Sequence, residues 1–75
     1  MAEIRIERGR DNFGRARPDQ LVAYVGRLAV ATALRASGSE VWVAERFGRR
    51  RRYVTNLSEV AAQELLLGWA REAAS

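Results

Sequence analysis

The stretch DQLVAYVGRLAVATALRA, residues 19–36, contains the longest apolar-rich run of the chain, and its interpretation decides the fold. Asp19 follows a proline and can cap a helix that begins there. At helical spacing, a single polar-leaning stripe is formed by Gln20, Tyr24, Arg27, Ala31 and Arg35. Gly38 can then supply the left-handed residue that often ends a helix. The pattern predicts an amphipathic helix over residues 19–36.

The apolar arc of this predicted helix is wider than one packed face requires. A glycine inside a helix costs about 1 kcal/mol relative to alanine, so we expect another element to approach closely at Gly26. A homodimer through this arc, or through Leu67 of the last helix, is compatible with the pattern.

The rest of the chain divides into shorter elements. Residues 3–7, EIRIE, alternate strictly between apolar and charged side chains, which predicts a half-buried strand. Residues 8–18 contain two glycines, a proline and an Asp-Asn pair, which predict a long loop. Residues 40–57 are interpreted as a hairpin, and residues 58–74 as a helix. Ser58 is one candidate cap of this helix, and Asn56 with Glu59 offers a competing capping box. We therefore predict a single α+β domain over residues 1–75, ordered β-α-β-β-α, with a three-stranded sheet and two helices packed on one face.

The predicted hairpin contains AERFGRRRRYVTN, residues 44–56, with four consecutive arginines. A two-residue turn at Gly48 and Arg49 suits the type II′ geometry, which favours glycine at its first position. That register pairs Glu45 with Arg52, a favourable contact between opposite charges.

In this register the two faces of the hairpin differ in character, because side chains alternate along a strand. Val43 pairs with Val54 on an aliphatic face, which we expect the helices to cover. The other face is then free and is both aromatic and basic, with Trp42, Arg46, Arg51 and Tyr53.

The composition excludes several kinds of chemistry. Thirteen arginines and no lysine stand against nine acidic residues, for a net charge of +4, and there is neither cysteine nor histidine. Disulfides, most metal sites and the usual general base at neutral pH are therefore ruled out, and no glycine-rich phosphate loop is present. We expect a protein that is not an enzyme and has no catalytic residue, cofactor or metal.

The N-terminal sequence MAEIRIERGR lacks the apolar region of a signal peptide. The longest apolar-rich run is too short for a membrane span and is interrupted by Arg27. We therefore expect a cytoplasmic protein that does not enter the membrane.

Aromatic rings among arginines on a sheet are the chemistry of single-strand binding surfaces, because bases stack on rings and guanidinium groups hold phosphate. Arginines of the long loop can extend such a surface. The candidate binding residues are Arg46, Arg49, Arg50, Arg51, Arg52, Trp42, Tyr53, Arg15 and Arg17. The simpler alternative is a solvated hairpin tip that discourages edge pairing, with Trp42 in the core.

Two functions fit these residues. The first is a small basic module that contacts nucleic-acid phosphate through the arginine-rich hairpin. The second is a non-enzymatic protein–protein interaction, or an inhibitor that docks its basic surface on an acidic partner. Small size and simplicity suit the phage or mobile-element type of inhibitor, such as an anti-CRISPR-like protein. A phosphate binder is expected to bind bare oligonucleotides with steep salt dependence, whereas a protein-directed inhibitor is expected to ignore them.

Overall fold

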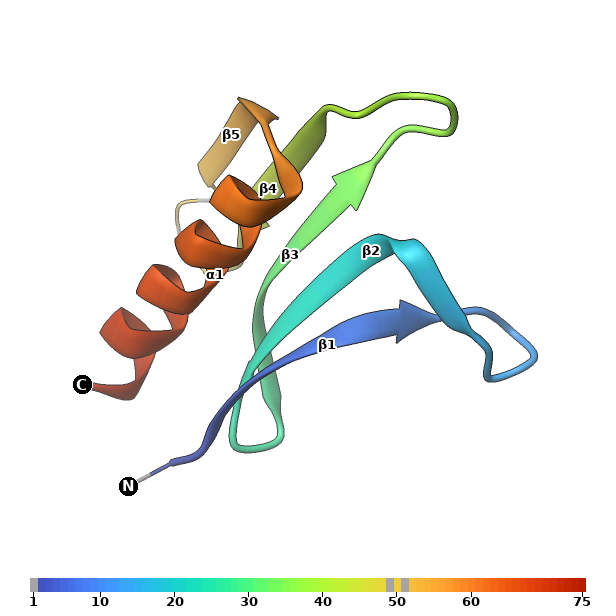
Figure 1. The fold of residues 1–75 in the computed structure, drawn as a ribbon. Coiled ribbons are helices and arrows are strands. Elements are labelled where there is room, and N and C mark those ends of the chain that lie inside the picture. Colours follow the sequence, from blue (N-terminus) through green and yellow to red (C-terminus); the bar gives the residue numbers. More distant parts are fainter. Residues whose placement is uncertain (1, 49, 51) are drawn as a thin grey trace.

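The computed structural model describes residues 2–48, 50 and 52–75, and this part of the chain forms an antiparallel sheet of five strands with one helix (Figure 1). The strands follow each other in space as they do in sequence, in the order β1-β2-β3-β4-β5. The elements are β1 (Ile4–Arg10), β2 (Ala16–Val25), β3 (Leu28–Arg35), β4 (Trp42–Arg46), β5 (Arg52–Leu57) and α1 (Glu59–Ala74). The molecule is thus a small α+β fold, but the predicted three strands and two helices are wrong.

Residues 19–36 are not a helix but lie mainly in β2 and β3, which form a hairpin. Gly26, in the connection between them, has a φ of 61°, which glycine adopts without steric cost. Leu21 and Ala23 of β2 pair with Ala33 and Ala31 of β3, and all four side chains are buried. This burial follows a period of two rather than 3.6. The wide helical arc expected to support a homodimer therefore does not exist.

The N-terminal strand is longer than predicted, and the loop after it is shorter. β1 continues to Arg10 through a register shift between Arg8 and Gly9, and β2 begins at Ala16. Much of the predicted loop 8–18 is therefore strand. In the remaining turn, Asp11 Oδ1 accepts hydrogen bonds from the N–H groups of Phe13 and Arg15, at 2.8 and 3.0 Å, so the turn is closed by one aspartate side chain.

β4 and β5 form a hairpin, but in a register one residue away from the predicted one. Ala44 lies opposite Val54, and Arg46 opposite Arg52. The core decides this register, because a shift by one residue would turn Val54 away from the helix. The strands end at Arg46 and begin again at Arg52, so the connection is longer than the predicted two-residue turn. Arg49 of that predicted turn lies outside the described residues.

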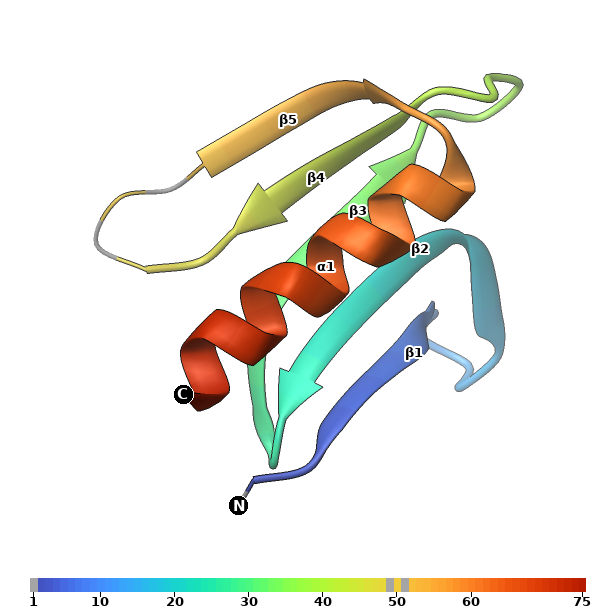
Figure 2. The ribbon, with the colours of Figure 1, turned by 60° about the vertical axis from the view of Figure 1, so that its left-hand side comes forward.

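Helix α1 covers one face of the sheet, as Figure 2 shows. It begins after Ser58, whose Oγ accepts a hydrogen bond from the Ala61 N–H at 3.1 Å. This cap satisfies one of the free donors of the first turn. The core between helix and sheet consists of Leu21, Ala23, Ala31, Ala33, Trp42, Ala44, Ala62, Leu66, Trp69 and Ala70.

The other face of the sheet is open. Leu34 and Val43 are cross-strand partners on it and are 44% and 39% exposed. Glu45 and Tyr53 are partners on the same face, and Tyr53 is 61% exposed. The sheet also has two distinct ends (Figure 2): β4 ends and β5 begins at the end that carries the β2–β3 turn, and the β1–β2 turn lies at the other end.

Candidate functional site

A basic cleft lies where β4 ends and β5 begins. Its volume is about 340 Å³, and its described lining residues are Arg46, Phe47, Gly48, Arg50 and Arg52. None of these lining residues is acidic. The cleft therefore offers positive charge and one aromatic ring, a chemistry suited to an anion.

The hairpin register places two of the cleft arginines directly opposite each other. Arg46 and Arg52 are cross-strand partners at the end of the ladder, and like charges in this position are destabilising. Arg46 Nη1 lies 3.1 Å from Glu72 Oε2 of α1, with 41% and 64% of the two side chains exposed. Within the described part of the chain, Arg50 and Arg52 have no ion pair. Among the described residues, the three arginines of the cleft therefore share a single ion pair, that of Arg46 with Glu72.

Phe47 belongs to the same site and has a fixed backbone position. Its N–H donates a hydrogen bond of 3.0 Å to the carbonyl of Val30, on the neighbouring strand. The side chain is 37% exposed and lines both the basic cleft and a smaller, more apolar hollow beside Trp69. Its partly open ring can meet an aromatic or apolar group of a ligand.

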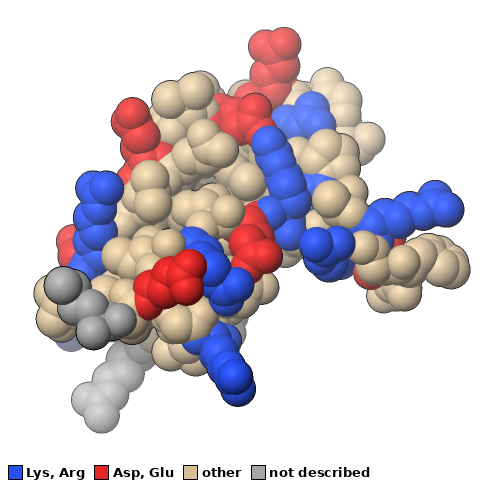
Figure 3. All heavy atoms as spheres, turned by 60° about the horizontal axis from the view of Figure 1, so that its bottom comes forward, with Lys and Arg blue, Asp and Glu red and all other residues tan. Residues whose placement is uncertain are grey.

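The other charged side chains do not form a single basic surface. Figure 3 shows arginines projecting from separate places on one face, with acidic side chains between them. The net charge of +4 is therefore distributed, and local geometry distinguishes the cleft from the remaining surface.

The structure separates the predicted binding residues. Trp42 is 2% exposed and lies in the core, with the Arg35 guanidinium 6.0 Å from its ring centroid. It therefore cannot stack on a base. Tyr53 is exposed, but on the open face of the sheet rather than on the face of Arg46. The predicted aromatic-basic face is not formed, because the register differs from the predicted one, and Arg51 lies outside the described residues.

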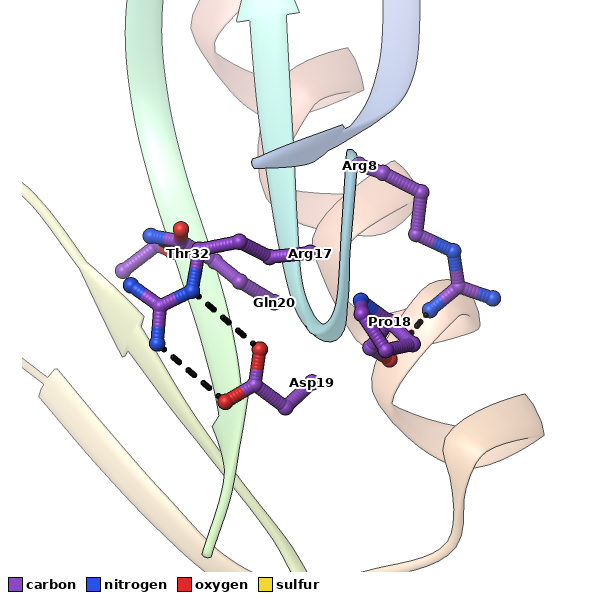
Figure 4. A network of polar contacts seen from close by, with 6 residues as sticks. All are labelled: Arg8, Arg17, Pro18, Asp19, Gln20 and Thr32. Atoms are coloured by element: carbon purple, nitrogen blue, oxygen red, sulfur yellow. Dashed lines mark hydrogen bonds and ion pairs between the residues drawn. The ribbon is translucent and has the colours of Figure 1, made fainter. Parts of the chain in front are cut away.

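The two loop arginines lie at the opposite end of the sheet from the cleft. Arg17 contacts Asp19 through two hydrogen bonds, Nε to Oδ1 at 3.3 Å and Nη2 to Oδ2 at 3.2 Å (Figure 4). These bonds hold the pKa of Asp19 below its ordinary value of 3.8. Arg15 is exposed in the β1–β2 turn. Neither residue extends the basic cleft.

A larger groove of about 580 Å³ lies at that opposite end. Its arginines are already engaged. Arg8 donates to the Pro18 carbonyl at 3.0 Å (Figure 4) and contacts Glu59 Oε1 at 2.7 Å, and Arg35 donates to the Ser39 carbonyl at 3.1 Å. Two glutamates also line the groove. This groove is consequently a weaker anion receptor than the cleft.

Phe47 is the cleft residue that sequence reasoning missed. It stands between Arg46 and Gly48 in the hairpin sequence, and that adjacency was the available signal. In the described part of the chain there is no cluster of three or more acidic side chains suited to a metal ion.

No protein-family model matches the chain, and neither the comparison with curated proteins nor that with solved structures gave a match. The helix found in residues 2–48, 50 and 52–75 lacks the length and apolar character required to cross a membrane. The function must therefore be argued from the cleft itself.

Proposed function

We propose that the protein is a small, non-enzymatic, cytoplasmic module that contacts nucleic-acid phosphate through the basic cleft. The observation that carries the proposal is the cross-strand pair of Arg46 and Arg52 in a cleft without acidic lining residues. A phosphate between the two guanidinium groups replaces repulsion with charge-assisted hydrogen bonds, which are about twice as strong as neutral ones.

Phe47 supports a nucleic acid rather than a free phosphate as the ligand. Its partly exposed ring lies beside the arginines of the cleft. Stacking of a base on an aromatic side chain is worth about 1–3 kcal/mol and tolerates any base. The expected binding therefore follows the phosphate backbone and carries little sequence preference.

The proposal is tested by fluorescence anisotropy with short single- and double-stranded DNA and RNA at two salt concentrations. If the cleft engages about two phosphates, affinity is expected to fall about tenfold between 50 and 200 mM salt. Arg50→Glu and Arg52→Glu are expected to weaken binding at least tenfold. Arg15→Glu is the matched control, since it changes the net charge equally at the other end of the sheet.

Two results would contradict the proposal. The first is an absence of oligonucleotide binding even at low salt. The second is an equal loss of affinity in the Arg15→Glu control, which would show that net charge rather than the cleft determines binding. Circular dichroism of each variant verifies that the fold is intact.

An acidic protein surface is the second candidate partner, as in a small inhibitor protein. The open face of the sheet, where Leu34, Val43 and Tyr53 are exposed, favours a protein as the partner, and the basic cleft favours an acidic one. Protein interfaces combine such apolar and tyrosine contacts with a polar rim. A complex that forms without nucleic acid and is weakened by Tyr53→Ala, while oligonucleotides do not bind, supports this candidate.

A further inference from the structure

We propose that two copies of the chain associate through β1, which pairs with β1 of the second copy in an antiparallel register centred on Ile6. The two sheets then become one continuous sheet with a twofold axis. The inference concerns the edge of the sheet farthest from the β4–β5 hairpin and does not depend on the proposed function.

The backbone of β1 presents free hydrogen-bonding groups at alternate residues. β1 is an edge strand, paired with β2 on one side only. The Gly26 N–H donates to the Glu3 carbonyl at 2.7 Å, so these two residues form a hydrogen-bonded pair. Such pairs alternate with non-hydrogen-bonded ones along antiparallel strands. The N–H and C=O groups of Ile4, Ile6 and Arg8 therefore point to the free edge.

The side-chain charges of β1 select one register among those that this edge permits. Centring on Ile6 places Arg5 opposite Glu7 of the second copy, and the same contact occurs twice because of the symmetry. A shift of one residue toward either end of the chain instead places Arg5 opposite Arg5 or Glu7 opposite Glu7. Opposite charges across a pair of strands are favourable and like charges are not. A register centred on Ile4 would also join opposite charges, Glu3 with Arg5, but Glu3 lies before the first residue of β1. The register centred on Ile6 is therefore the one in which both members of each charge pair are strand residues.

β1 is a regular strand over the residues of that register, and the charged side chains there are accessible. β1 pairs with β2 without interruption from Ile4 to Arg8. The Arg5 and Glu7 side chains are 41% and 44% exposed and already lie 3.0 Å apart within one chain. In the dimer they form a cluster of four alternating charges. Ile6, which is half-buried against the core, meets Ile6 of the second copy on the helix-covered side.

The other edge of the sheet is protected against the same pairing. Asn56 of β5 has a φ of 58°, which interrupts the regular edge, and Arg52 places a charge at its beginning. Bulges and charges of this kind are common defences of edge strands. β1 has a regular, self-complementary segment instead, which directs association to this edge.

An edge-to-edge contact of five residues is small, so we expect a weak, reversible dimer. Sedimentation equilibrium up to about 1 mM protein measures its dissociation constant. Arg5→Glu and Glu7→Arg each place two like-charge pairs in the interface and are expected to raise that constant at least tenfold. The double exchange Arg5→Glu with Glu7→Arg is expected to return it to within about threefold of the original value.

The decisive sample is an equimolar mixture of the two single variants. In the mixed dimer, the glutamate introduced by Arg5→Glu lies opposite the arginine introduced by Glu7→Arg, and the native Glu7 of the first chain lies opposite the native Arg5 of the second. Both contacts then join opposite charges, so a heterodimer should form. A role of these residues in folding alone cannot produce this recovery, and urea unfolding of each variant verifies that it is folded. A wild-type chain that stays monomeric at 1 mM, or a mixture that does not associate, would overturn the proposal.

Discussion

Replacing Arg52 by glutamate should make the protein more stable while it removes the proposed function. In the structure Arg52 faces Arg46 across the β4–β5 ladder. Arg52→Glu converts this like-charge pair into an opposite-charge pair without changing the core, since Arg52 is exposed. A residue that only supports the fold would show the reverse effect on stability.

The size of the expected gain in stability follows from the exposure of Arg46 and Arg52. Cross-strand pairs contribute about 0.2–1 kcal/mol, and exposed charges lie in the lower part of that range. The substitution removes a repulsion and adds an attraction, but Arg46 is already partly neutralised by Glu72. We therefore expect a gain of about 0.5–1 kcal/mol in the free energy of unfolding, which is about 3–6 °C in Tm for a domain of this size.

Urea unfolding followed by tryptophan fluorescence measures this gain, because Trp42 and Trp69 are both buried. The stability difference between Arg52→Glu and the wild type should shrink in 0.5 M salt, as expected for exposed charges. Inorganic phosphate should stabilise the wild type more than the variant. A variant that is equally stable or less stable than the wild type at low salt would refute the reasoning, with Arg15→Glu as the charge-matched control.

Three further predictions concern the fold. Leu66→Ala should reduce the free energy of unfolding by about 2–5 kcal/mol in urea titrations, because Leu66 is fully buried. Ser58→Ala should cost about 1 kcal/mol in the same assay, since the Ala61 N–H loses its capping acceptor. The hydrogen bonds from Arg17 lower the pKa of Asp19 from 3.8, so its stabilising effect is present above that pH and is lost as the pH falls through the lower, folded-state pKa. Asp19→Asn should therefore lose less stability than the wild type in acid titrations followed by circular dichroism.

The β2–β3 hairpin could not be recognised from its composition alone. Residues 19–36 are apolar at consecutive positions on both faces of the strands, which hides the period of two. Their alanines also favour a helix intrinsically, and tertiary pairing overrides that preference. Gly26 and Arg27, between two apolar runs, are the remaining signal for a turn. The C-terminal helix was easier to predict, because its cap and apolar stripe both lie within one local segment.

Only part of the candidate site could be predicted from the sequence, because the rest depends on contacts between distant segments. The arginines of the hairpin are evident in the sequence, and three described members line one cleft. Which aromatic residue accompanies them depends on the register of β4 and β5. That register is decided by the burial of Trp42, Ala44 and Val54 against a helix that follows later in the chain. Local patterns contain no record of that contact, so they leave two positions open for Trp42, the aromatic-basic face and the core, and its burial confirms the core.

The small residues of the core have a consequence for mutational tolerance. Among the described residues, six of the ten in the core are alanines, on both the sheet and α1. Alanine loses no rotamer entropy on burial, but it can be exchanged only for glycine or for something larger. Larger residues there would separate the helix from the sheet, at a cost of about 1–3 kcal/mol each. In most cores, one large apolar side chain can be replaced by another of similar volume. The helix–sheet contact of this protein allows few such substitutions. Sequence variation is therefore expected to concentrate in the turns and on the open face.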